Sequence, residues 1–317
     1  MTVQSIPTGI SVNQFIGFKP GPKLVILGAV HGNETCGTQA INRLRQEIES
    51  GLVRIDAGTL TMVPVTNPLA YQLERRHGDR NLNRNMSRSD APNDFEDLVC
   101  NALCPVLEQH DVLLDLHSFQ APGIPFALIG APNNTGALEP ITKAAQEETL
   151  AMSLGVNRFV EGWLDTYAQG VADRQARGVE SHVDYGVGTT ETMRRSGGIA
   201  VTLECGQHAD VSAPDTAYVA IRNALACLGM TSDAAPAIVK EPEVIRLYRV
   251  IDRLHVDDSF CRQWLSFEKI EKGTLIGHRH DGSELTAHED GWIVFPNNNA
   301  QVNQEWFYLA SRSNRLS

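Results

Sequence analysis

Three side chains of this sequence have the types and the spacing that bind catalytic zinc. His31 and Glu34 lie three residues apart in the segment His-Gly-Asn-Glu, and His117 follows much later in the chain. Catalytic zinc sites commonly use two His and one Glu and leave the fourth position to water. The zinc lowers the pKa of that water to about 7, which makes it a nucleophile near neutral pH. We therefore expect His31, Glu34 and His117 to hold one Zn²⁺ per chain.

Glu204 is the candidate general base. It comes directly after the apolar run from residue 199 to residue 203 and directly before Cys205-Gly206. A carboxylate in this place could take a proton from the zinc water and pass it to a leaving amine. Asp115 lies two residues before His117, on the same side of the expected strand, and could hold that imidazole from behind.

Basic side chains gather in the segment from residue 75 to residue 84, which holds four arginines in an acidic protein. An arginine can stabilise the oxyanion of a tetrahedral intermediate, and another can clamp a substrate carboxylate through two parallel hydrogen bonds. Arg76, Arg84 and Arg194 are the candidates for these roles.

The elements that must position these residues alternate between strands and helices. Apolar runs predict strands at 23–30, 59–65, 111–116, 156–160 and 199–203, and helical patterns cover 35–50, 94–109, 138–154 and 214–228. Such alternation predicts an α/β sheet with helices on both faces. Ligands of these folds bind beyond the carboxyl ends of the strands, where His31, His117 and Glu204 all fall.

The pattern changes near residue 232, where small residues and proline suggest a linker. Short strand-like runs at 244–253, 274–276 and 291–295 follow, separated by Gly and Asp turns. We expect an α/β zinc-hydrolase domain over residues 1–232 and a small C-terminal β domain over residues 233–317.

Composition narrows the class of partner. The net charge is −11 and the pI is near 5.4, which argues against a nucleic acid or an anionic membrane surface because both require a basic footprint. No secretion signal and no run of 18 apolar residues is present, so a soluble, cytoplasmic protein with a small-molecule substrate is expected. The oligomeric state is not indicated by the sequence.

Several short motifs together resemble one enzyme family. These motifs are His31-Gly-Asn-Glu34, Asn67-Pro68 with Arg76, Asn83-Arg84, Asp115-Leu-His117, Arg194 ten residues before Glu204, and, near the C-terminus, Glu271-Lys-Gly-Thr-Leu275 and Val294-Phe-Pro296. They are similar to the motifs of the succinylglutamate desuccinylase/aspartoacylase family, which belongs to the zinc carboxypeptidase clan. The resemblance extends over most of the chain.

The resemblance implies a zinc-dependent hydrolase that cleaves the amide bond of an N-acyl amino acid, with water activated by Glu204. It also implies a carboxypeptidase-like mixed β-sheet flanked by helices, and a C-terminal β domain that helps to close the site. Arg76 would polarise the scissile carbonyl, and Asn83, Arg84 and Arg194 would bind substrate carboxylates.

Two alternatives remain open at this point. Asn83-Arg84 could equally hold the terminal carboxylate of a short peptide, which would make the protein a zinc carboxypeptidase. A metal-binding protein without catalysis is the other alternative, although the presence of both Glu204 and Arg76 counts against it.

Overall fold

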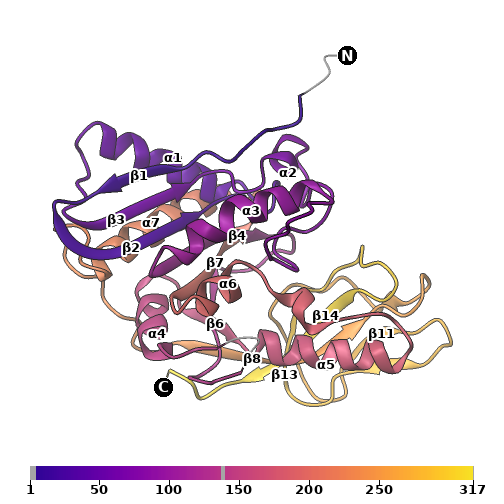
Figure 1. The fold of residues 1–317 in the computed structure, drawn as a ribbon. Helices are drawn as coiled ribbons and strands as arrows, with labels where there is room; N and C mark the ends of the chain where they lie inside the picture. Colours follow the sequence, from indigo (N-terminus) through magenta and orange to yellow (C-terminus); the bar gives the residue numbers. More distant parts are fainter. Residues whose placement is uncertain (1–4, 137–139, 317) are drawn as a thin grey trace.

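A large mixed β-sheet forms the centre of the molecule in the computed structural model, which describes residues 5–136 and 140–316. Among these residues eleven strands hydrogen-bond in the order β1-β3-β2-β4-β7-β5-β6-β8-β14-β13-β10. The strands β2, β3, β4 and β7 run parallel to one another, whereas β5 is antiparallel to β7 and parallel to β6. This mixed sheet flanked by helices (Figure 1) confirms the fold class expected from the sequence.

The strands of the large sheet vary from three to ten residues in length. Their bounds are β1 Asn13–Ile16, β2 Lys19–Leu27, β3 Ala57–Val63, β4 Val112–Phe119, β5 Phe126–Leu128, β6 Arg158–Glu161, β7 Ile199–Gln207, β8 Glu243–Asp252, β10 Glu268–Ile270, β13 Gly291–Val294 and β14 Glu305–Arg312. A smaller sheet contains β9 Ser259–Phe260, β11 Leu275–His278 and β12 Glu284–Thr286.

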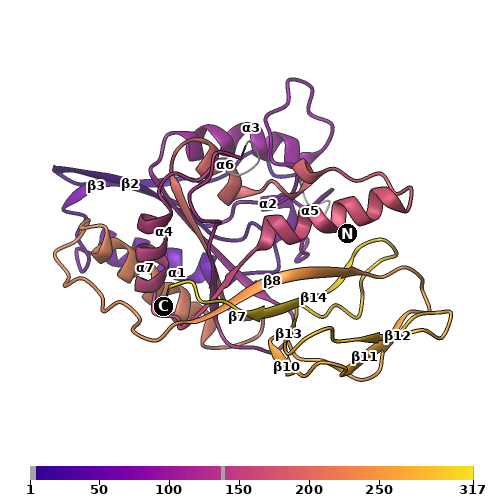
Figure 2. The same cartoon turned by 90° about the horizontal axis from the view of Figure 1, so that it is seen from below.

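Helices cover both faces of the sheet. They are α1 Cys36–Glu49, α2 Pro68–Gln72, α3 Phe95–Glu108, α4 Ala144–Ser153, α5 Trp163–Ala176, the 3-10 turn η1 Val183–Gly186, α6 Thr189–Arg195 and α7 Ala213–Cys227. Figure 2 shows α1, α4 and α7 on one side of the sheet and α3 and α6 on the other.

The core follows from the alternation of side chains along the strands. Leu24 and Ile26 of β2 pack with α1 and α7, whereas Val25 and Leu27 of the same strand pack with α3. Successive residues of a strand point to opposite faces, so a strand covered on both sides is apolar throughout. The continuous apolar runs in the sequence are the consequence of this double cover.

Two helices begin with a side-chain cap. The side chain of Asp94, at the start of the helical pattern predicted over 94–109, accepts a hydrogen bond from the Asp97 amide and caps α3. Asn67 caps the short helix α2 in the same way, with Pro68 at the first helical position.

Other elements differ from the expectation. The helix expected over residues 138–154 begins only at Ala144, since residues 140–143 are not helical. Residues 138 and 139 of that range lie outside the described part of the chain. Several elements were not predicted from the sequence: the helices α2, α5 and α6, and the strands β1, β5, β9, β10, β12 and β14. Among the described residues no helix is long and apolar enough to cross a membrane.

The predicted domain boundary near residue 232 falls between α7 and β8. Strand β8 pairs in parallel with β6, so the large sheet continues across this boundary into the C-terminal strands (Figure 2). The division into residues 1–232 and 233–317 stays a prediction.

Candidate active site

His31 and Glu34 lie in the loop that follows β2 at the carboxyl end of the parallel strands. The loop turns tightly, since the Glu34 amide donates to the His31 carbonyl oxygen at 3.1 Å. Gly32 packs against α2 so closely that a Cβ at this position would lie 2.0 Å from the Ala70 carbonyl carbon. Only glycine fits there, which explains the Gly between the His and the Glu.

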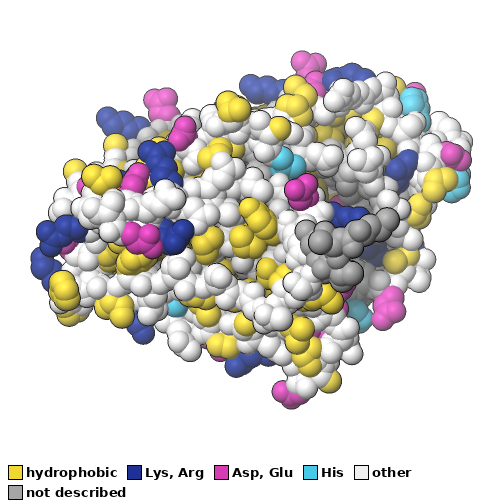
Figure 3. All heavy atoms as spheres, turned by 90° about the horizontal axis from the view of Figure 1, so that it is seen from above, with side chains coloured by type: hydrophobic (Ala, Val, Ile, Leu, Met, Phe, Trp, Pro, Cys, Tyr) yellow, Lys and Arg dark blue, Asp and Glu magenta, His cyan; other side chains and the backbone are white. Residues whose placement is uncertain are grey.

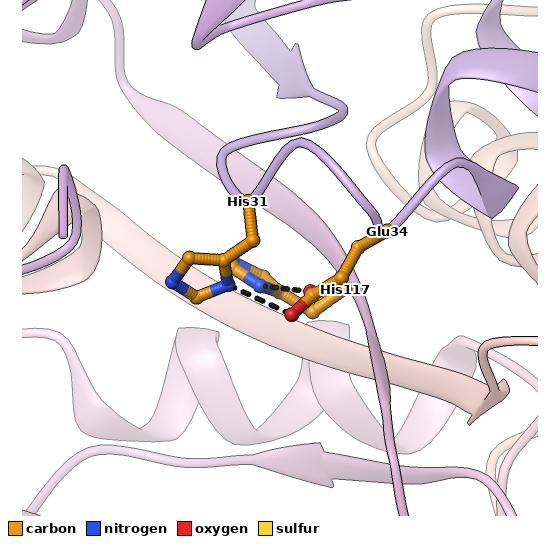
Figure 4. Close-up of side chains that lie close together, drawn as sticks. All are labelled: His31, Glu34 and His117. Atoms are coloured by element: carbon orange, nitrogen blue, oxygen red, sulfur yellow. Dashed lines mark hydrogen bonds and ion pairs between the residues drawn. The ribbon is translucent and has the colours of Figure 1, made fainter. Parts of the chain in front are cut away.

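The structure brings His31, Glu34 and His117 together, and all three are almost completely buried. Glu34 lies between the imidazoles, with Oε1 2.9 Å from His31 Nδ1 and Oε2 2.8 Å from His117 Nδ1 (Figure 4). One ligand atom from each residue lies within 4.8 Å of the others, and within the described residues no other group of three or more His, Cys, Asp or Glu side chains does so. The convergence expected from the sequence is therefore present.

The Nε2 atom of each imidazole, which does not face Glu34, contacts a further side chain. His117 Nε2 lies 3.0 Å from Asp115 Oδ2, the partner proposed from the strand spacing. His31 Nε2 lies 3.0 Å from Asn81 Oδ1, a partner that the sequence did not suggest. Such contacts fix the orientation of metal-binding imidazoles and leave the Nδ1 atoms facing Glu34.

The pKa values of the two imidazoles are shifted in opposite directions. Burial, together with the nearby charge of Arg76, lowers the pKa of His31 to about 4. Burial opposes protonation of His117, but Asp115 and Glu34 outweigh it and raise its pKa well above the usual value. Two imidazole nitrogens and a carboxylate in this arrangement are a donor set that fits one zinc ion, which would displace the proton of His117.

Glu204 faces the cluster from the neighbouring strand. It is paired with His117 in the register of β4 and β7, and its Oε2 is buried without a hydrogen-bond partner. Burial, followed by the negative charge of Glu34, raises the pKa of Glu204 to about 7. A carboxyl group with this pKa can both take up and release a proton near neutral pH.

Arg76 belongs to the loop after α2, and its guanidinium donates to Glu34 Oε1 at 2.8 Å. The side chain is half exposed, so it can also reach a ligand. The loop is anchored by Glu96 of α3, whose carboxylate accepts hydrogen bonds from the amides of Gly78, Asp79 and Arg80. Glu96 was not recognised in the sequence, because nothing local marks a helical Glu as a partner of a preceding loop.

The predicted carboxylate-binding residues differ in the groups that they contact within the protein. Asn83 and Arg84 line the cavity beside the cluster, and the Asn83 Oδ1 accepts from the Thr189 amide at 2.9 Å. Arg194 also borders the cavity, but its guanidinium donates to both carboxylate oxygens of Glu147 at 2.8 and 2.9 Å. The substrate-binding roles of these three residues stay predictions.

The cluster opens into a cavity of about 1440 Å³. Figure 3 shows a hollow on the upper face of the molecule with basic side chains inside it. The cavity wall includes Phe295 from the motif Val294-Phe-Pro296. It also includes residues that the sequence analysis did not single out, because their types do not separate a cavity wall from core or surface: Trp163, His208, Glu305 and Tyr308.

Part of the chain matches a known family of proteins. Residues 20–158 match the model of the succinylglutamate desuccinylase/aspartoacylase catalytic domain. The chain is 23% identical over 300 residues to a succinylglutamate desuccinylase from Vibrio parahaemolyticus, with 89% of this chain and 78% of the relative covered.

Solved structures with the same fold include two of particular interest. A succinylglutamate desuccinylase/aspartoacylase from Rhodobacter sphaeroides superposes with a TM-score of 0.73 at 19% identity, covering 96% of this chain and 89% of the other. The product-bound ectoine utilization protein EutE (DoeB) from Ruegeria pomeroyi gives a TM-score of 0.69 at 18% identity, covering 95% and 88%. These likenesses show a shared fold.

Proposed function

We propose that this chain, whose residues 20–158 match the succinylglutamate desuccinylase/aspartoacylase catalytic domain, is a zinc-dependent hydrolase of N-acyl amino acids. The observation that carries the proposal is the buried group of His31, Glu34 and His117 with Glu204 facing it. A divalent ion held by these three residues would polarise the amide carbonyl and lower the pKa of a water molecule.

Glu204 and Arg76 are proposed to supply the other catalytic roles. Glu204 takes a proton as the water oxygen attacks the carbonyl carbon, and it returns that proton to the amide nitrogen as the carbon–nitrogen bond breaks. The products are a carboxylic acid and a free amino acid. Arg76, whose guanidinium lies beside Glu34, is proposed to hold the carbonyl oxygen while negative charge develops on it.

The proposal is tested by the Glu204→Gln variant of the zinc-loaded protein on a panel of N-acyl amino acids. General acid–base catalysis contributes about 10²- to 10⁴-fold, so the rate of amide hydrolysis should fall by that factor while zinc content is unchanged. Glu108→Gln, on an exposed part of α3, is the matched control and should keep full activity. Equal rates for Glu204→Gln and the unaltered protein would refute the proposed role of Glu204.

The same panel separates the alternatives. Faster hydrolysis of dipeptides than of any N-acyl amino acid would identify a carboxypeptidase. Full zinc occupancy without turnover of any amide would identify a metal-binding protein that lacks catalysis.

A further inference from the structure

The basic side chains of the cavity differ in whether a carboxylate of the protein already holds them. Arg76 contacts Glu34, which belongs to the metal cluster, and is assigned above to the scissile carbonyl. Four further arginines form ion pairs within the protein, with N···O distances between 2.6 and 3.1 Å: Arg80 with Asp94 and Asp97, Arg174 with Asp252, Arg194 with Glu147, and Arg246 with Asp165.

Arg84 is the exception among the described arginines of the cavity. Its Nη1 donates to the Asn83 carbonyl oxygen at 2.8 Å, and within the described residues no carboxylate oxygen forms an ion pair with it. A guanidinium carries five N–H donors, so most of those of Arg84 are left for water or a ligand in the cavity. A partly buried cation gains most from an anionic partner, which marks this position for one carboxylate of a substrate.

An aromatic wall stands beside Arg84. The Trp163 ring centroid lies 5.5 Å from Arg84 Cζ. Trp163 stacks on Tyr308 at 5.2 Å and meets the edge of Phe295 at 6.4 Å between ring centroids. This wall offers large apolar faces, which favour an apolar substituent next to the carboxylate.

An acidic side chain, Glu305, lines the cavity together with Arg84 and the aromatic wall. Glu305 is the strongest electrostatic partner of Arg84, and its Oε1 lies 3.7 Å from the Arg174 guanidinium, which Asp252 already holds. A second carboxylate on the substrate would meet Glu305 without an arginine to pair with, and like charges brought together in a cavity are unfavourable.

Resting on the proposed deacylase function, we propose that the preferred substrate is an N-acyl amino acid with a single carboxylate and a neutral, apolar side chain. Arg84 pairs with that carboxylate, as the family resemblance already implies, and the new element is the wall of Trp163, Phe295 and Tyr308, which receives the side chain. N-acyl amino acids with an acidic side chain fit less well, because the ion pair of Arg194 with Glu147 removes a second carboxylate site.

The inference is tested by kcat/KM of the zinc-loaded protein on three classes of substrate. N-acetylphenylalanine represents the neutral class, N-acetylaspartate and N-succinylglutamate the acidic class, and N-acetylornithine the cationic class. We expect the neutral substrate to have the highest kcat/KM. A preference for the acidic or the cationic class would overturn this inference and leave the deacylase function intact, whereas no turnover in any class would overturn both.

The role of Arg84 is tested by binding to the Glu204→Gln protein, which holds substrate without cleaving it. With Arg84 unchanged, this protein should bind N-acetylphenylalanine about 10- to 100-fold more tightly than N-acetylphenylalanine amide, which lacks the carboxylate. This ratio is the range expected for a charge-assisted hydrogen-bonded pair. With Arg84→Met added, this ratio should fall to near one, whereas Arg88→Met, an exposed residue paired with Glu108, should leave it unchanged. A ratio that survives Arg84→Met would show that another group binds the carboxylate.

Discussion

Replacing Glu96 by Gln should detach the loop that carries Arg76. Glu96 is fully buried, and its two carboxylate oxygens accept four hydrogen bonds. Oε1 accepts from Asn67 Nδ2 at 2.8 Å and from the Gly78 amide at 2.9 Å, and Oε2 accepts from the amides of Asp79 and Arg80, both at 3.1 Å.

The size of the effect follows from this count. Gln keeps one acceptor oxygen, and its NH₂ group would face two N–H donors that it cannot satisfy. A buried donor without a partner costs about 1–3 kcal/mol, so the free energy of unfolding should fall by about 2–6 kcal/mol. This is a large part of the roughly 5–15 kcal/mol by which folded proteins are stable.

Urea unfolding of Glu96→Gln measures the loss, and kcat/KM on an N-acyl amino acid reports the displacement of Arg76. Glu108→Gln is the matched control at the exposed end of the same helix and should cost less than about 1 kcal/mol. If Glu96→Gln unfolded at the same urea concentration as Glu108→Gln, the anchoring role of Glu96 would be wrong.

Three further predictions concern the metal site and the C-terminal strands. Asp115→Asn should weaken zinc binding about 10- to 100-fold, measured by competition with a chelator, because His117 loses its charged partner. Removing the metal with a chelator should lower the melting temperature and added Zn²⁺ should restore it, since a ligand that binds only the folded state stabilises that state; an unchanged melting temperature would argue against a metal site. Burial opposes ionisation of Asp258, but Arg279 and nearby backbone amides hold its pKa at about 2, below the ordinary value of 3.8. Its carboxylate therefore stabilises the fold by about 2 kcal/mol above about pH 4, and this contribution is lost between about pH 4 and 2. By urea unfolding, Asp258→Asn should have a lower free energy of unfolding than the unaltered protein at about pH 7, and the difference should shrink toward about pH 2.

The sequence predicted the centre of the site because the information there is local. Apolar runs placed strands before His31, His117 and Glu204, and parallel strands that end at the same edge of a sheet bring such residues together. The structure confirms the strands and the convergence.

The surroundings of the site could not be predicted in the same way. Strand β5 has three residues, too few for a periodic pattern, so its antiparallel insertion beside β7 has no sequence signal. The α5 helix begins after Gly162, which provides no side-chain cap. Asn81 contacts His31, which is distant in sequence, and Glu96 binds backbone amides, so neither contact leaves a local sequence pattern. Arg194 forms its ion pair with Glu147, 47 positions away, for which the same holds.

The pairing of β6 with β8 limits how the cavity can open. Four residue pairs, from Arg158 with Glu243 to Glu161 with Arg246, join the strands on either side of residue 232. Swinging the C-terminal strands outward as a hinged lid would rupture this ladder and strip Phe295 and Tyr308 from the wall. Substrate therefore enters through an opening that the paired strands keep at a fixed width. A chain cut short at residue 232 would lose Phe295, Glu305 and Tyr308 from the cavity wall, together with the partner strand of β6.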